Sequence, residues 1–266
     1  MTPQLFTAVK WSMVRLPKGS STDELFRVAK AAGFDGISLT GPGVYDTDEV
    51  KRARDAHELP VHNVNIADHW QVRLSDPDPA VREKALGNTT GAITFAHAVG
   101  ASTVLQVIGK VTDPLNENAD NVRERSSEQL RKALPVASRL GVRIACENVA
   151  NGFGETLAEW NAYLSSFDSP WIGAFFDIGN HDRFEGGAAA WIRGLGRHVM
   201  KIDVKDHDHA AQKNCDLFKG NVDWPAVRSA LAEIGYHGWA TAEVSGGGVE
   251  ELFRVDRDMR KALITG

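Results

Sequence analysis

Short apolar runs alternate with longer amphipathic segments along the whole chain, and this alternation constrains the fold more than any other feature. Runs of about 4–8 apolar or β-branched residues between turn signals are typical of buried strands, and the amphipathic segments are typical of helices. The predicted strands are residues 6–11, 36–40, 61–65, 103–108, 142–148, 172–177, 199–204 and 239–243. The predicted helices are residues 21–32, 46–57, 79–99, a segment ending near 140, 157–166, 188–195, 224–234 and 249–264.

Eight strands in alternation with eight helices, at a period of roughly 30 residues, predict an α/β fold, the (β/α)8 TIM barrel of about 250 residues. A doubly wound open sheet is the alternative. It would carry a glycine-rich phosphate turn after its first strand, and residues 11–18 read Trp-Ser-Met-Val-Arg-Leu-Pro-Lys instead. No linker or low-complexity tract divides the chain, so we expect one domain over residues 1–266.

The composition excludes several classes of partner. A net charge of -5 and a pI near 6.0 argue against nucleic-acid binding. No run approaches the ~20 apolar residues of a membrane span, and the N-terminus lacks the pattern of a signal peptide. The two cysteines, Cys146 and Cys215, are expected to be free thiols in a reducing compartment. We therefore expect a cytoplasmic protein that binds a small molecule; homo-oligomerisation stays open.

The last four predicted strands each end at an acidic residue. In a barrel of this type, the carboxyl ends of the strands form the active-site face, so these side chains should converge. Carboxylates a few ångströms apart raise each other's pKa, and a divalent cation such as Mg²⁺ or Mn²⁺ would resolve the conflict. The alternative is that each acid caps the helix after its strand. The predicted metal ligands are Glu147, Asp177, Asp203 and Glu243.

Polar residues follow these acids closely. Asn180 comes after Asp177, Lys205 comes after Asp203, and His209 follows in the same loop. So many hydrogen-bonding groups suit a polyhydroxylated ligand. The alternatives are that His209 is a solvated loop residue and that Lys205 pairs with Asp206 as part of the structure.

Five segments resemble the xylose isomerase-like TIM barrels, the sugar isomerase/epimerase superfamily, and the resemblance spans nearly the whole chain. They are Cys146-Glu147-Asn148, residues 176–180 (Phe-Asp-Ile-Gly-Asn), residues 202–206 (Ile-Asp-Val-Lys-Asp), residues 220–224 (Gly-Asn-Val-Asp-Trp), and residues 235–239 (Gly-Tyr-His-Gly-Trp) leading to Ala242-Glu243. In this order and spacing they are specific for the superfamily, but not for one substrate.

The resemblance implies a divalent metal, Mn²⁺ or Mg²⁺ with Co²⁺ or Zn²⁺ as alternatives, held by Glu, Asp, His and Glu from the last four strands. Glu147, Asp177 and Glu243 match this pattern, whereas Asp203 stands where the family has His. Asp203 can serve as an oxygen ligand; the alternatives are weak metal binding or recruitment of His207 or His209.

The resemblance also implies that Glu147 and Glu243 are the acid and base of an isomerase or epimerase that removes a proton beside a sugar carbonyl through an enediolate. Asn180 is the expected hydroxyl partner of the substrate, and His69 and Trp70, with Lys10 and Gln106 as weaker candidates, are expected around the sugar. The absence of an obvious arginine cluster favours an unphosphorylated sugar or keto-sugar.

Three other functions are compatible with such a barrel. A metal-dependent dehydratase or lyase on a keto-sugar, keto-inositol or 3-keto-glycoside begins with the same proton abstraction. A non-catalytic sugar-binding barrel follows if Asp203 has abolished metal binding. A DNA-repair endonuclease is disfavoured, because no histidine ends the last four strands and the net charge is negative.

Overall fold

A closed barrel of parallel strands forms the centre of the computed structural model, which describes residues 4–149 and 151–265. Around the barrel the strands follow the order β1-β10-β7-β6-β5-β4-β3-β2, so the first and last strands close the sheet. The predicted TIM barrel is therefore confirmed. The barrel strands are β1 (Leu5–Lys10), β2 (Gly36–Gly41), β3 (Val61–Ile66), β4 (Thr103–Val107), β5 (Arg143–Glu147), β6 (Ile172–Asp177), β7 (Val199–Val204) and β10 (Gly238–Ala242).

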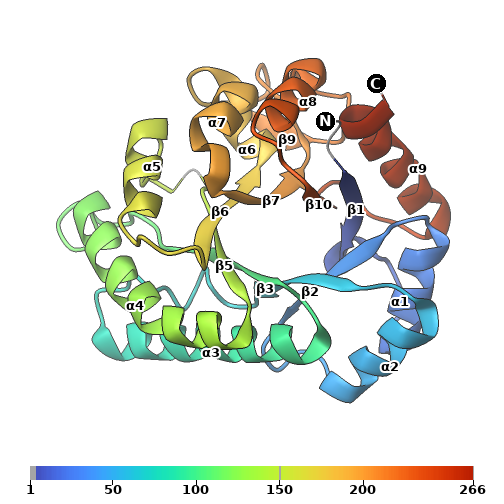
Figure 1. Ribbon diagram of the computed structural model, residues 1–266, viewed down its shortest axis with the longest axis horizontal. Helices are drawn as coiled ribbons and strands as arrows, with labels where there is room; N and C mark the ends of the chain where they lie inside the picture. Colours follow the sequence, from blue (N-terminus) through green and yellow to red (C-terminus); the bar gives the residue numbers. More distant parts are fainter. Residues whose placement is uncertain (1–3, 150, 266) are drawn as a thin grey trace.

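Helices surround the barrel on its outside (Figure 1). They are α1 (Thr22–Ala31), α2 (Thr47–His57), α3 (Pro79–Val99), α4 (Ala119–Leu140), α5 (Leu157–Ser165), α6 (Ile178–Asp182), α7 (Gly187–Leu195), α8 (Trp224–Glu233) and α9 (Val249–Arg260). Their ends follow local chemistry: the Ser21 hydroxyl accepts from the Glu24 amide at the start of α1. Gly100 ends α3 with φ 85°, a left-handed conformation that glycine adopts without strain.

Two apolar regions stabilise this arrangement. The larger one fills the layer between the sheet and the helices and includes the fully buried Phe26, Trp160 and Trp191. The smaller one lies inside the barrel and consists of Leu105, Val107, Ala145 and Phe175. Because side chains alternate between the two faces of a strand, the inward-facing positions near the strand ends remain available for polar groups.

A hairpin and a short helix were not predicted from the sequence. An antiparallel hairpin of β8 (Asp206–Asp208) and β9 (Lys213–Cys215) follows β7, and the short helix α6 directly follows β6. The predicted last helix is also divided, since α9 ends at Arg260 and a π-helical turn covers Lys261–Thr265. The hairpin sequence, Asp-His-Asp and Lys-Asn-Cys, lacks the apolar alternation that signals a strand.

The hairpin is held in place by the side chain of Asp206. This buried carboxylate accepts hydrogen bonds from the backbone N–H groups of His207, Phe218 and Val222 and from Nε1 of Trp224. Such contacts join segments that are separate in the sequence. They exist only after the loop has folded, so no local pattern could indicate them.

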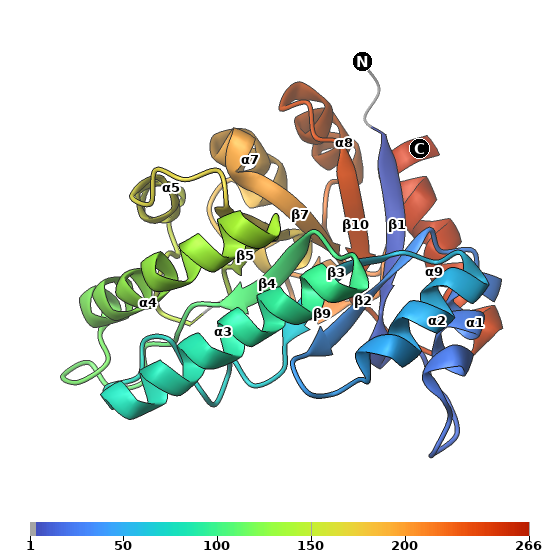
Figure 2. The ribbon, with the colours of Figure 1, turned by 60° about the horizontal axis from the view of Figure 1, so that its bottom comes forward.

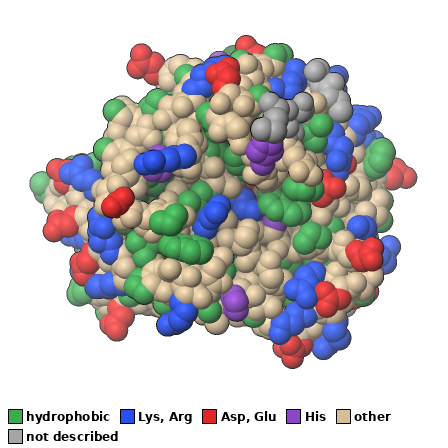
Figure 3. Space-filling view, in the orientation of Figure 1, with side chains coloured by type: hydrophobic (Ala, Val, Ile, Leu, Met, Phe, Trp, Pro, Cys, Tyr) green, Lys and Arg blue, Asp and Glu red, His purple; other side chains and the backbone are tan. Residues whose placement is uncertain are grey.

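All barrel strands point the same way, so their carboxyl ends share one end of the barrel, at the lower side of Figure 2. Figures 1 and 3 view the opposite end, where β1 begins. Lys and Arg side chains lie near the middle of that face in Figure 3. The two ends of the barrel therefore differ in chemistry, because the four predicted acidic ligands all belong to the carboxyl ends.

Lys201, on β7, lies inside the barrel below the predicted ligands. Its ammonium group lies 5.7 Å from the centre of the Trp239 ring and 3.4 Å from the Ser102 hydroxyl, and it has no carboxylate partner among the described residues. Burial lowers the pKa of Lys201 to about 7, and the nearby Arg143 guanidinium contributes to the shift. A buried ammonium without a counter-ion is unfavourable for folding.

We predict that Lys201→Met stabilises the protein. Between the folded-state pKa of about 7 and the ordinary lysine pKa near 10.4, the unfolded chain binds a proton that the folded chain does not, so this lysine destabilises the fold increasingly as the pH falls through that window. The free energy of unfolding should rise by roughly 1–3 kcal/mol below pH 7, with a smaller gain near pH 10. Thermal unfolding across this pH range measures the effect. The exposed Lys84→Met is the control, and a gain independent of pH would contradict the argument.

Candidate active site

The four predicted acidic ligands come together at the carboxyl ends of their strands. One oxygen from each of Glu147, Asp177, Asp203 and Glu243 lies within 4.8 Å of the others. Asp177 and Asp203 are direct neighbours in the pairing of β6 with β7, and Glu147 ends β5. Glu243 follows β10 immediately, and its amide donates to the Val204 carbonyl. The convergence expected from the sequence is therefore observed.

Helix capping explains part of the position of Asp177. Its Oδ1 accepts from the Asn180 amide at the start of α6, as the capping alternative predicted for each acid. The other oxygen of Asp177, Oδ2, points to the cluster and lies 2.6 Å from Lys205 Nζ. One carboxylate thus serves both roles.

Two lysines lie among the four acids. Lys205 Nζ lies 2.6 Å from Asp177 and 2.9 Å from Glu243, so the alternative pairing with Asp206 is not observed. Lys10 Nζ lies 2.6 Å from Asp203 and 2.9 Å from Glu243. Four carboxylates and two ammonium groups leave two formal negative charges uncompensated.

Barrel closure accounts for the position of Lys10. Strands β1 and β10 pair with Val9 beside Ala242, so Lys10 and Glu243, the next residue on each strand, are placed side by side. Lys10 was only a weak candidate for the sugar pocket in the sequence, because nothing local relates the end of the first strand to the acids of the last four.

Burial shifts the two aspartates in the same direction. It raises the pKa of Asp177 to about 6, although Lys205 opposes the shift. It raises the pKa of Asp203 to about 8, although Lys10 opposes the shift. In both cases the desolvation of a buried carboxylate outweighs the stabilisation that one ammonium provides.

The two glutamates differ from each other. Burial and the neighbouring Glu243 raise the pKa of Glu147 well above its ordinary value. Burial alone would raise the pKa of Glu243 as well, but Lys10 and Lys205 outweigh it and hold that pKa below its usual range. Groups whose environments separate their pKa values in this way are suited to opposite roles in proton transfer.

The donor set fits a divalent cation. Asp203 Oδ1 is buried and accepts no hydrogen bond within the described part of the chain. A buried oxygen without a partner is unfavourable, and a cation would satisfy it. The oxygen ligands are those that Mg²⁺ and Mn²⁺ prefer, and two uncompensated negative charges match one divalent ion.

A pocket of about 380 Å³ opens above the cluster. Seven residues singled out from the sequence line it: Lys10, His69, Trp70, Glu147, Asn180, Lys205 and Glu243. Ser12 and Asn65 also line it and were missed, because neither belongs to a motif. Gln106 is not among the lining residues; it is buried and its Oε1 accepts from the Thr89 hydroxyl.

The predicted pocket residues differ in their surroundings. His69 is buried, and burial together with the Lys10 charge lowers its pKa to about 4, so it is a neutral hydrogen-bonding group. The Trp70 ring meets it edge-on at 5.8 Å and is 45% exposed, as a residue at the pocket mouth can be.

The two histidines of the hairpin lie outside the acidic cluster. His207 Nδ1 contacts Asn214 Oδ1 at 3.0 Å, and His209 Nε2 contacts Asp182 at 2.7 Å. The alternative in which either histidine replaces the missing family ligand is therefore not observed. His209 is also not among the residues lining the pocket.

The hairpin nevertheless reaches the site through Asn180. Asn214 Nδ2 donates to Asn180 Oδ1 at 3.2 Å, and Asn180 Nδ2 donates to Glu147 Oε1 at 3.3 Å. These two bonds orient the Asn180 amide toward Glu147 and connect the hairpin to one of the two glutamates. The sequence suggested Asn180 as a pocket residue but not this connection.

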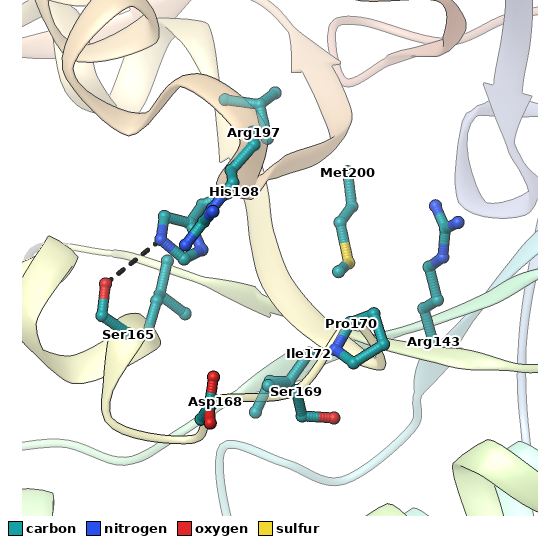
Figure 4. Close-up of a pocket in the computed structure, with 11 residues that line it drawn as sticks. Arg143, Ser165, Asp168, Ser169, Pro170, Ile172, Arg197, His198 and Met200 are labelled. Atoms are coloured by element: carbon teal, nitrogen blue, oxygen red, sulfur yellow. Dashed lines mark hydrogen bonds between the residues drawn. The ribbon is translucent and has the colours of Figure 1, made fainter.

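A larger hollow, about 450 Å³, lies at the amino ends of β5, β6 and β7 (Figure 4). Arg143, Arg197 and His198 line it, and Asp168 is its acidic residue. His198 Nε2 contacts the Ser165 hydroxyl at 3.2 Å. None of the four clustered acids reaches this hollow, so its size does not make it the better candidate for the active site.

No helix within the described residues is both long and apolar enough to cross a bilayer.

Comparison with known proteins agrees with the fold. L-ribulose-5-phosphate 3-epimerase UlaE of Escherichia coli (strain SE11) is 28% identical over 239 residues, which is 84% of this chain and 82% of that enzyme. The crystal structure of a D-tagatose 3-epimerase-like protein has a TM-score of 0.83 at 18% identity and covers 97% of this chain and 96% of its own. The IOLI protein with a binding zinc atom has a TM-score of 0.81 at 14% identity, with 98% of each chain covered.

A family model described as xylose isomerase-like TIM barrel matches residues 26–263, which is most of the chain. The likeness of the solved structures supports the same fold. The resemblance stated from the strand-end motifs is thus confirmed, and the chain belongs to the xylose isomerase-like TIM barrels.

Proposed function

We propose that the protein is a divalent-cation-dependent epimerase or isomerase of an unphosphorylated sugar or keto-sugar. The observation that carries the proposal is one pocket lined by two glutamates, Glu147 and Glu243, whose surroundings separate their pKa values. The similar proteins named above support it, since one is a sugar-phosphate 3-epimerase and another is D-tagatose 3-epimerase-like.

The cation is assigned to Glu147, Asp177, Asp203 and Glu243. When bound, it would supply Lewis-acid polarisation of a substrate carbonyl. The buried, unpartnered Asp203 Oδ1 and the two uncompensated negative charges support this assignment. Mn²⁺ and Mg²⁺ are proposed because all four ligand groups are carboxylates.

Proton transfer is assigned to the two glutamates. Glu243, kept ionised by its two lysines, accepts the proton from the carbon beside the carbonyl. The C–H electron pair becomes the C=C bond of an enediolate, and the carbonyl π pair moves to oxygen. Glu147, which is readily protonated, returns a proton to the opposite face, and the reverse reaction exchanges the two roles.

The residues described around the pocket include no arginine that could bind a phosphate, which favours an unphosphorylated substrate. Asn65, Asn180 and the neutral His69 are instead suited to hydroxyl groups, and the half-exposed Trp70 can stack on a sugar ring.

The first prediction from the proposed function concerns proton exchange. With Mn²⁺ in D₂O, the protein should introduce deuterium beside the carbonyl of a ketose or 3-keto-glycoside, detected by NMR and mass spectrometry over a substrate panel. Glu147→Gln and Glu243→Gln should each lower this exchange by about 10²–10⁴-fold, because each removes one general acid–base group.

Glu155 is an exposed residue in the loop after β5. The Glu155→Gln variant is the matched control and should exchange the substrate proton at the wild-type rate. Exchange that is unchanged in both pocket variants would remove the glutamates from proton transfer. A product with an ultraviolet-absorbing conjugated enone would establish elimination in place of epimerisation.

The second prediction concerns the cation. Calorimetric titration should detect Mn²⁺ binding to the wild type, and Asp203→Asn should weaken binding at least about tenfold, because it removes a charge and an oxygen ligand. Asp182→Asn, which alters an acid paired with His209 outside the cluster, is the control. If wild-type protein shows neither binding heat nor a thermal shift with Mn²⁺ or Mg²⁺, the cation assignment is wrong.

A further inference from the structure

The position of Lys10 in the pocket depends on the closure of the barrel. Its side chain is 8% exposed, and its Nζ contacts Asp203 at 2.6 Å and Glu243 at 2.9 Å. It also lines the pocket that contains the two glutamates. The ammonium is therefore buried among the acids and at the same time faces the space assigned to the sugar.

The charge of Lys10 acts on several groups around the pocket. Asp203, Glu243 and Glu147 together raise the pKa of Lys10, although burial opposes the shift. Burial lowers the pKa of His69, another residue that lines the pocket, and the charge of Lys10 lowers it further. The Lys10 ammonium thus pairs with two of the acids, and Lys10 belongs to the same pocket lining as His69.

Lys205 provides a useful comparison. It also contacts Glu243 at 2.9 Å, and its second partner is Asp177 at 2.6 Å. Its stem is packed against Gly179, where an added Cβ would lie 2.6 Å from Lys205 Cγ. Lys205 is therefore packed against the start of α6, and both lysine side chains are only 8% exposed.

The proposed reaction places new negative charge in this acidic environment. Formation of the enediolate moves an electron pair onto the substrate oxygen, beside the four carboxylates of the cluster. A positioned cation is the group that stabilises such charge without reorganisation. Asp203 and Glu243 hold the Lys10 ammonium in place before the reaction, so the stabilising charge is preorganised.

We propose that Lys10 is a catalytic residue that contacts the substrate and stabilises the oxyanion formed when the proton is removed. The inference rests on the proposed function, because it requires a substrate carbonyl in this pocket. It adds a second electrophile, supplied by the first strand, to the cation assigned to the four acids. Asp203 then has two roles: Oδ2 holds Lys10, and Oδ1 is free for the cation.

The test compares Lys10→Met with Lys10→Arg in steady-state kinetics and in Mn²⁺ titration calorimetry. Lys10→Met should lower kcat by about 10²–10³-fold, the range found when one oxyanion-stabilising group is removed. Its Mn²⁺ affinity should be equal to or higher than that of wild type, because removal of a positive charge beside the ligands cannot weaken their attraction for a cation. Lys10→Arg, which keeps the charge, should recover part of kcat.

A purely structural role gives the opposite pattern. If Lys10 only positions Asp203 and Glu243, Lys10→Met should lose Mn²⁺ affinity and thermal stability together with activity, and the inference is overturned. It is equally overturned if Lys10→Met keeps kcat within about threefold of wild type. The exposed Lys110→Met, in the loop after β4, is the matched control for removal of one charge near the same end of the barrel.

Proton exchange by the wild-type protein distinguishes failure of this inference from failure of the proposed function. Wild-type protein that exchanges substrate protons while Lys10→Met does so equally well contradicts only the role of Lys10. Wild-type protein that exchanges no proton from any ketose or 3-keto-glycoside contradicts the proposed function, and the role of Lys10 with it.

Discussion

Desolvation of four neighbouring carboxylates is the constraint on which the site depends. Each would lose several kcal/mol of hydration if buried as an uncompensated anion. Two lysines offset part of this loss, since Lys205 and Lys10 share Glu243 and each contacts one aspartate. The remaining negative charge is what makes the site suitable for a divalent cation.

The barrel lowers the conformational cost of this arrangement, because it fixes the charged side chains on different strands. Rigid parallel strands hold Asp177 and Asp203 side by side, and closure of β1 on β10 places Lys10 beside Glu243. No side chain then has to be ordered by a flexible loop alone. The hairpin after β7 contributes at a distance, since Asn214 orients the Asn180 amide that donates to Glu147.

Asp203 stands where the resemblance implies a histidine, and its negative charge is coupled to a neighbouring lysine. An additional carboxylate in the ring would increase the repulsion among the acids, and Lys10 compensates for it at 2.6 Å. The pair therefore keeps the charge of the ring within the range that one divalent cation can balance. This explains how an acidic residue is tolerated at a position where the resemblance leads one to expect a neutral ligand.

Most of the fold could be predicted from local patterns. Apolar runs such as 172–177 and 199–204 and the helix boundaries at Ser21 and Gly100 are decided by nearest neighbours along the chain, so the barrel and the four convergent acids followed from the sequence. The β8–β9 hairpin could not be predicted, because the bonds of Asp206 that hold it connect distant segments.

The sequence by itself therefore determined the architecture, the family and the acids at the strand ends, all of which have local signatures of hydrophobic periodicity and strand-end chemistry. Only the tertiary structure decided which cations compensate those acids, that His207 and His209 lie outside the cluster, and that Lys10 faces the pocket. The physical reason is that charge compensation depends on distances through space. Those distances were set when the first strand closed the barrel against the last.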